Sequence, residues 1–103
     1  MNGDVAQLNS IMAGRGDGPT KIWATEYGAP TGGPNSVTEQ AQATMVTDSL
    51  NVWYAKPYAG PMFWYSVRDT GTSTSDREQH FGVLRYDGTA KPAYATLASL
   101  FTR

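Results

Sequence analysis

The residue of this sequence best placed to do chemistry is Glu26, which stands at the end of a short segment that predicts a buried β-strand. Ile22, Trp23 and Thr25 favour a strand, and the Gly-Asp-Gly-Pro run before them interrupts regular structure. In α/β enzymes, catalytic side chains stand at the carboxyl ends of parallel strands. We therefore take Glu26 as the candidate catalytic residue. An exposed glutamate in a loop is the other interpretation that the spacing allows.

Composition removes several other kinds of chemistry. The 103 residues contain no cysteine and one histidine, His80, so we expect no thiolate nucleophile, no disulfide and no Cys- or His-based metal cluster. The 8 basic and 9 acidic residues are scattered, which argues against nucleic acid or a membrane surface as partner. No apolar run approaches the roughly 20 residues of a membrane span. The first residues, Met1–Asp4, show neither the basic nor the apolar region of a signal peptide.

Five segments have the periodicity of regular structure, and helices alternate with strands. The expected elements, in chain order, are a helix over 4–13, a strand over 20–27, a helix over 37–56, a strand over 60–69 and a helix from Pro92 to about residue 101. This α-β-α-β-α order predicts an α/β fold in which the middle helix joins two parallel strands by a right-handed crossover. No repeat or internal boundary divides the chain, so we expect a single domain over residues 1–103.

The connecting segments carry local signals of their own. The Gly- and Pro-rich stretch 29–35 is typical of a loop that lies over a functional site. Ser36 and Glu39 form a capping-box pattern at the start of the long helix. Residues 70–76 predict a solvated polar loop, and 81–88 predict a short extended piece that ends in a tight turn.

Three ordered motifs resemble one group of enzymes. They are Trp23–Gly28 (WATEYG), Phe63–Asp69 (FWYSVRD) and Phe81–Tyr94 (FGVLRYDGTAKPAY). With them, residues 5–101 resemble the C-terminal portion of a retaining (β/α)8-barrel glycosidase, in the clan that includes the family 5 cellulases and the β-xylosidase-like family 39 enzymes. The resemblance implies a partial barrel, namely its last two βα units preceded by one helix. It also implies hydrolysis of O-glycosidic bonds in a β-linked oligo- or polysaccharide, without metal or organic cofactor.

The resemblance further implies roles for single residues. In that clan the Thr-Glu-aromatic-Gly motif ends the seventh strand and its Glu is the nucleophile, while the Trp of Phe-Trp-Tyr ends the eighth strand and lines the sugar pocket. Carried over to this sequence, Glu26 is the nucleophile and Trp64 is the aromatic platform for the substrate. Tyr27 and Tyr65 are expected either to hydrogen-bond the nucleophile or the sugar, or simply to pack.

Strand alternation predicts which of these side chains face the barrel interior. The two expected interior sets are Ile22, Ala24 and Glu26 in the first strand and Met62, Trp64 and Ser66 in the second. Trp23 and Thr25 are then expected to face the helices, and Glu26 and Trp64 to converge at the mouth. For Arg68 and Asp69 we favour a loop-fixing salt bridge over contact with sugar, and for His80 a structural role.

The sequence supplies only one of the two carboxyl groups that the chemistry needs. A retaining glycosidase places a nucleophile and an acid/base about 5 to 5.5 Å apart. In the resembling clan the acid/base follows an Asn, and this sequence contains no Asn-Glu pair. Its other glutamates are Glu39, in the expected helix cap, and Glu78, in a polar segment. Because a complete barrel takes about 250 residues, we expect a catalytic segment that is inactive as an isolated chain.

Two non-catalytic functions stay open beside this one. Two parallel strands leave unpaired edges and an uncovered apolar face, which favours a barrel fragment that forms a homo-oligomer or complements a partner chain carrying the missing strands. A residual carbohydrate-binding module, with Trp64 and the tyrosines against glycans, is the other. Relatives of this kind are often secreted, but the sequence leaves the localisation unknown.

Overall fold

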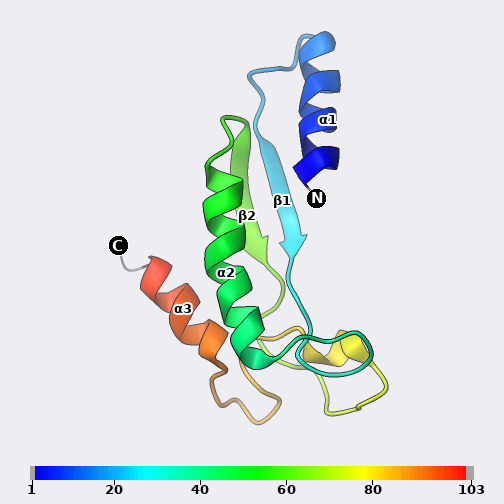
Figure 1. Cartoon of the computed structure of the whole chain (residues 1–103), viewed down its shortest axis with the longest axis vertical. Coiled ribbons are helices and arrows are strands. Elements are labelled where there is room, and N and C mark those ends of the chain that lie inside the picture. Colours follow the sequence, from blue (N-terminus) through cyan, green and yellow to red (C-terminus); the bar gives the residue numbers. More distant parts are fainter. Residues whose placement is uncertain (1, 102–103) are drawn as a thin grey trace.

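The computed structural model describes residues 2–101, and the side chains of residues 4–100. Its elements, in chain order, are α1 (Asn2–Gly14), β1 (Ile22–Tyr27), α2 (Glu39–Tyr54), β2 (Ala59–Trp64), the short 3₁₀ helix η1 (Arg77–His80) and α3 (Pro92–Phe101) (Figure 1). The predicted α/β order is confirmed, since β1 and β2 form a parallel two-stranded sheet and α2 joins them. The sequence did not predict η1.

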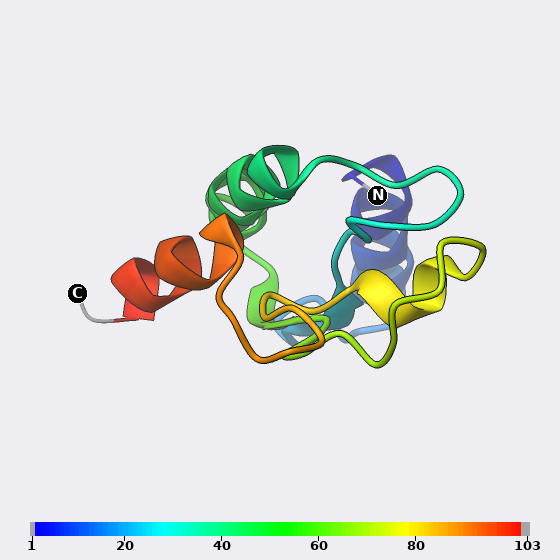
Figure 2. The ribbon, with the colours of Figure 1, turned by 90° about the horizontal axis from the view of Figure 1, so that it is seen from below.

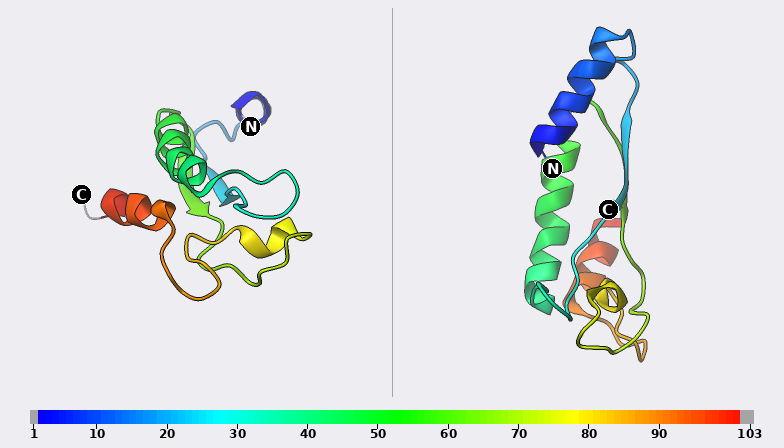
Figure 3. Two further views of the ribbon diagram at one scale, coloured as in Figure 1. Left: turned by 60° about the horizontal axis from the view of Figure 1, so that its bottom comes forward. Right: turned by 90° about the vertical axis from the view of Figure 1, so that its right-hand side faces the viewer.

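The helices lie on one side of the sheet, where α2 packs against β2. α1 and α2 lie on the same side of β1 and β2, and α3 lies beside α2 (Figures 1 and 3). The segments that follow the two strands gather at one end of the molecule (Figure 1), the end that faces the viewer in Figure 2. This layered arrangement, with the loops at the carboxyl ends of parallel strands, is that of (β/α) barrel units.

The core lies between α2, α3 and the sheet. Ala43 and Val46 of α2 are buried with Val83 and with Ala93 of α3. Four partly buried side chains pack against this cluster: Leu50, Trp64, Leu97 and Leu100. By contrast, α1 leaves Leu8 and Ile11 exposed.

The two strands do not pair in an even register. The paired residues are Ile22 with Ala59, Ala24 with Met62, and Tyr27 with Trp64, so the register shifts twice along the sheet. At the first shift the backbone N–H of Met62 donates to the hydroxyl of Tyr54 at 3.1 Å. At the second shift, two residues of β1 stand opposite one of β2, as in a β-bulge.

The second strand is shorter than its apolar run predicts. It ends at Trp64 rather than at Asp69, because from Ser66 onward the chain bonds to a different segment. The N–H of Ser66 donates to the carbonyl oxygen of Phe81, and the N–H of Asp69 to that of Leu84, both at 2.9 Å. The predicted extended piece therefore exists, but it pairs with the chain after β2.

The long helix is capped by Thr38, not by the predicted capping box. The Thr38 hydroxyl accepts from the N–H of Ala41 at 3.0 Å, and the helix begins at Glu39. Ser36 lies outside the helix, and the Glu39 carboxylate instead binds Arg85 at 2.7 and 3.0 Å.

Replacing Thr38 by alanine is therefore expected to lower the free energy of unfolding by about 0.5–2 kcal/mol, because an amide of the first turn loses its acceptor. Urea unfolding followed by circular dichroism measures the change. Ser36→Ala is the matched control and is expected to have little effect. A larger loss in Ser36→Ala than in Thr38→Ala would contradict this assignment of the cap.

Candidate active site

Glu26 lies one residue before the end of β1 and is exposed. Within residues 2–101 its carboxylate has no hydrogen bond or ion pair, so no neighbour of this segment neutralises it. Tyr27 pairs with Trp64, and their rings meet edge to face at 5.9 Å. Because adjacent strand residues point to opposite faces, Glu26 points away from Trp64.

The predicted faces of the sheet are consequently wrong. Trp23 was expected to face the helices, but it is 59% exposed and contacts Phe63, which is 50% exposed, at 6.2 Å between ring centroids. These two rings mark the sheet face that no helix of the described chain covers. An even alternation would place Glu26 on the helix side of the sheet, together with Ile22 and Ala24. The β-bulge between Ala24 and Tyr27 instead brings Glu26 onto the open face.

Trp64 was expected on the same face as Glu26, and that placement is also wrong. Its indole packs against the core between α2 and α3, and its Nε1 is buried without a hydrogen-bond partner in the described part of the chain. Tyr27 packs against this indole. The sugar-binding role of Trp64 and Tyr27 stays a prediction, and in this segment their rings lie behind the strands as seen from Glu26.

Tyr65 follows β2 directly and is 38% exposed. Its ring contacts that of Phe81 at 5.3 Å, and the guanidinium of Arg77 lies 5.8 Å from the centre of the Phe81 ring. Tyr65 lies in a bend just beyond the end of β2, where strand alternation no longer assigns a face. Its substrate-binding role stays a prediction.

Gly28 allows the ends of the two strands to approach each other. The N–H of Tyr65 donates to the carbonyl oxygen of Tyr27 at 2.9 Å, and a Cβ added at Gly28 would collide with the carbonyl oxygen of Tyr65. The backbone after Glu26 is thus held against the chain after β2.

Gly28→Ala is therefore expected to destabilise the fold by about 1–3 kcal/mol, as overpacking at a site with no free volume does. Thermal or urea unfolding tests it. Gly14→Ala is the control, because a Cβ there meets no atom within 4 Å. Equal melting temperatures for the Gly28 variant and the unmodified chain would contradict the close approach.

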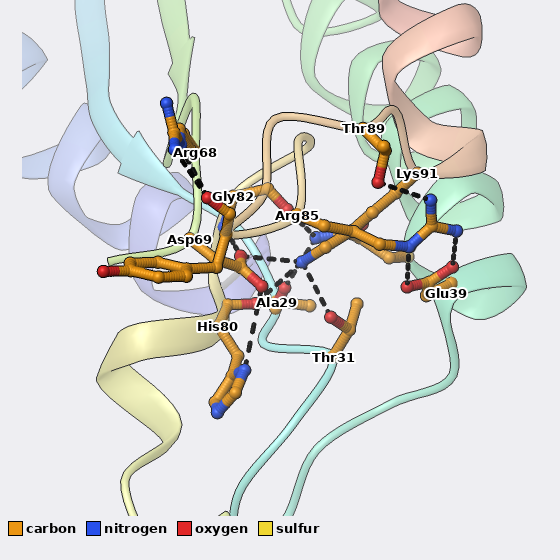
Figure 4. A network of polar contacts seen from close by, with 12 residues as sticks. Ala29, Thr31, Glu39, Arg68, Asp69, His80, Gly82, Arg85, Thr89 and Lys91 are labelled. Atoms are coloured by element: carbon orange, nitrogen blue, oxygen red, sulfur yellow. Dashed lines mark hydrogen bonds and ion pairs between the residues drawn. The ribbon is translucent and has the colours of Figure 1, made fainter. Parts of the chain in front are cut away.

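A buried polar cluster, which sequence reasoning missed, joins the loops beyond the strand ends (Figure 4). Lys91 is 2% exposed, and its ammonium binds the carboxylate of Asp69, which is 8% exposed, at 2.8 Å. The same ammonium donates to the Thr31 hydroxyl at 2.8 Å and to the His80 carbonyl oxygen at 3.4 Å. We call Lys91, Asp69, Thr31 and His80 the loop cluster. A lysine before a helix-starting proline gives no local sign that it is buried.

The loop cluster decides the roles of three polar residues. Asp69 forms the predicted loop-fixing salt bridge, but with Lys91 and not with Arg68, whose guanidinium donates to the Tyr86 carbonyl oxygen at 2.6 and 3.0 Å. The structural role of His80 is confirmed, since one ring nitrogen lies 3.7 Å from Asp69 and the other 2.5 Å from the carbonyl oxygen of Ser73.

A second charged pair fixes the turn before α3. The two hydrogen bonds to Glu39 raise the pKa of the half-exposed Arg85 guanidinium. At the predicted tight turn, the side-chain and backbone bonds from Thr89 lower the pKa of the Asp87 carboxyl. Both shifts favour the charged forms, so the turn is built on charges that persist at neutral pH.

In residues 2–101 no three His, Cys, Asp or Glu side chains stand close enough to hold a metal ion. A cavity of about 150 Å³ lies beside the start of β1, at the opposite end of the strand from Glu26, and is lined by Asn9, Gly18, Pro19, Lys21, Pro57 and Tyr58. No helix of the described chain has the length and apolarity to cross a membrane.

No protein-family model and no curated protein matches the chain. Solved structures do match it. A family 39 glycoside hydrolase from the gut symbiont Bacteroides cellulosilyticus is 27% identical, with a TM-score of 0.67, over 79% of this chain and 16% of its own. A GH5_18 protein from Streptomyces cattleya in complex with Manβ1-4GlcNAc is 23% identical, with a TM-score of 0.68, over 82% of this chain and 21% of its own.

A more distant likeness extends over most of the chain. A β-glucuronidase from Faecalibacterium prausnitzii is 16% identical, with a TM-score of 0.66, over 94% of this chain and 18% of its own. The chain thus spans about a fifth of the length of the solved structures that it matches. The predicted fold class, a partial (β/α)8 barrel, is confirmed.

Proposed function

We propose that this chain, a segment of a glycoside hydrolase (β/α)8 barrel, supplies the nucleophile Glu26 to a retaining β-glycosidase. The acid/base carboxyl would come from outside these 103 residues. The observation that carries the proposal is the position of Glu26, an unpaired carboxylate at the carboxyl end of a barrel strand, on the face that no helix covers. In barrels, that end of the strands is where substrates bind.

The proposed reaction has two steps. The Glu26 carboxylate attacks the anomeric carbon of a β-linked sugar, while the second carboxyl group protonates the leaving glycosidic oxygen. The first product is a glycosyl ester on Glu26 with inverted configuration. A water molecule, deprotonated by the same second carboxyl, then attacks the anomeric carbon, expels Glu26 and restores the original configuration.

Neither of the other two glutamates follows an Asn, as the acid/base of the resembling clan does. Glu39 is held in two hydrogen bonds by Arg85 on the helix side of the sheet. Glu78 lies in η1, where its N–H is bound by the Asp76 carboxylate that caps the turn. We therefore place the acid/base on another part of the barrel, as the resemblance to retaining glycosidases implies.

The open face would receive the rest of the barrel. Trp23 and Phe63 expose large apolar surfaces there, and β1 and β2 have no further strand beside them in the described residues. Further parallel strands, from the same domain or from a second chain, would cover the rings and leave Glu26 at the mouth. Residues 1–103 would then be part of one catalytic domain, and Tyr65, which is 38% exposed beyond the end of β2, would be accessible to the sugar.

The proposed substrate is a β-linked oligo- or polysaccharide. A bound Manβ1-4GlcNAc in GH5_18 proteins supports a carbohydrate ligand for this type of barrel. A cellulase is the finer possibility that the sequence resemblance favours. A non-catalytic fragment that assembles with copies of itself is the second candidate, which the exposed rings of the open face favour.

Replacing the matching segment of the family 39 enzyme with this chain tests the proposal. The host would keep its own acid/base, and hydrolysis of aryl β-glycosides would be measured. Turnover in the chimera, with a glycosyl adduct of a 2-fluoro glycoside mapped to Glu26 by mass spectrometry, is the expected result. The isolated chain is expected to give none. A folded, active chimera whose adduct maps to another residue would overturn the proposal.

A further inference from the structure

The loop cluster stands where three segments of chain meet beyond the strand ends. Thr31 belongs to the loop after β1 and Asp69 to the segment after β2. Lys91 is the residue directly before α3. The Lys91 ammonium makes one hydrogen bond to each of three oxygens, those of Asp69, Thr31 and His80. Figure 4 shows its side chain reaching between Asp69 and Thr31.

The Asp69 carboxylate extends this arrangement to a further segment. It accepts from the N–H of Gly82 at 2.9 Å, and the N–H of Thr31 donates to the His80 carbonyl oxygen at 3.0 Å. From α2, the buried amide of Gln42 donates at 3.1 Å to the carbonyl oxygens of both Ala29 and Gly82. The loop after Glu26 is therefore held at Ala29 and twice at Thr31.

Burial makes these contacts interdependent. An ammonium and a carboxylate withdrawn from water are tolerated only when each is paired and its remaining hydrogen-bonding capacity is satisfied. A movement of the Thr31 loop or of the segment at Gly82 would leave part of a buried charge without a partner. The two charges thus resist displacement of either segment, in a way that an apolar contact, which is non-directional, does not.

We propose that Lys91 and Asp69 are positioning residues for the proposed reaction, acting through a buried ion pair that fixes the loop following Glu26 against the chain following β2. The proposal rests on the proposed function of Glu26. Neither residue touches the substrate. Lys91 holds Thr31, five residues after the nucleophile, and Asp69 holds the segment that carries Phe81, the ring against Tyr65.

The test is amide hydrogen exchange of this chain, measured by nuclear magnetic resonance, because that readout is independent of catalysis. Lys91→Met is expected to raise the exchange rates of the Thr31 and Gly82 amides by at least about tenfold, which corresponds to about 1.4 kcal/mol of local stability. The Val46 amide in the core of α2 reports opening of the whole fold, and its rate is expected to rise with the loss of global stability. Unchanged rates at Thr31 and Gly82 would overturn the proposal.

Two further variants test the proposal independently, in case Lys91→Met does not fold. Thr31→Val removes only one acceptor and is expected to speed exchange at Thr31 but not at Gly82. Lys91→Cys, aminoethylated under denaturing conditions and refolded, regains an ammonium of nearly the length of lysine, and no other cysteine of the chain reacts. Protection of both amides is expected to return, and failure to return would count against the ion pair.

The catalytic part is tested separately in the family 39 chimera. Lys91→Met is expected to lower kcat about tenfold or more with little change in KM, as loss of an interaction realised only in the transition state does. Lys56→Met is the matched control. An inactive chimera with the expected exchange pattern would remove the proposed function and leave the ion pair as a loop anchor. An unchanged kcat would overturn the positioning role.

Discussion

Lys91→Met is expected to lower the free energy of unfolding by about 3–5 kcal/mol, the loss that follows when one partner of a buried ion pair is removed. The reason is the Asp69 carboxylate, which is 8% exposed and would stay buried without its cation. Asp69→Asn is expected to destabilise in the same way, through the Lys91 ammonium. Urea unfolding followed by circular dichroism measures both losses.

A double variant separates the ion pair from simple loss of packing. Asp69→Asn combined with Lys91→Met leaves no buried charge, keeps an acceptor for the Gly82 N–H, and is expected to recover more than half of the loss. The control is Lys56→Met, because Lys56 has no ion pair among the described residues. This substitution is expected to change the free energy of unfolding by less than about 0.5 kcal/mol. Losses that simply add in the double variant would contradict coupling between the two charges.

Glu26→Gln is expected to reduce kcat/KM of the chimera on the order of 10⁴- to 10⁶-fold, the range seen when a nucleophile or its partner is removed from a catalytic triad. The amide is nearly the same size but cannot form the glycosyl ester. Because Glu26 has no bond within residues 2–101, stability is expected to change little, so activity and folding can be read independently.

Glu78→Gln is the matched control, since it makes the same chemical change in an exposed glutamate of η1. Its activity is expected to stay within about twofold of the unmodified chimera, as for a surface substitution away from the site. Comparable losses in the two variants would point to a general effect of removing negative charge, and would remove Glu26 from the nucleophile role.

Much of the fold could be predicted from the sequence because the signals are local. The apolar periodicity of α2, the Pro92 start of α3 and the β-forming residues of β1 each act within a few residues, and all three elements occur. The position of Glu26 at a strand end follows from the same signals. The N-cap of α2 was predicted at Ser36 and lies two residues later, at Thr38. Both residues offer a hydroxyl group, and only the path of the backbone selects between them.

The predictions that failed depend on contacts between residues that lie far apart in the sequence. The faces of the sheet were misassigned because alternation assumes an even register, and a bulge reverses every assignment beyond it. Trp64 consequently lies in the core rather than beside Glu26. The partners of Lys91 stand 22 and 60 residues away, and no pattern of residue types along the chain marks such a pair.

The loop cluster also bears on recombination between barrels. The loop cluster and Gln42, which supports it, all lie within residues 31–91. A crossover outside this stretch therefore transfers every anchor of the loop after Glu26 together. A crossover inside it, for example between Asp69 and Lys91, would join a buried lysine to a barrel without its carboxylate. Barrel segments of this kind should therefore be exchangeable as cassettes whose permitted ends are set by the buried charges, and not by the boundaries of single βα units.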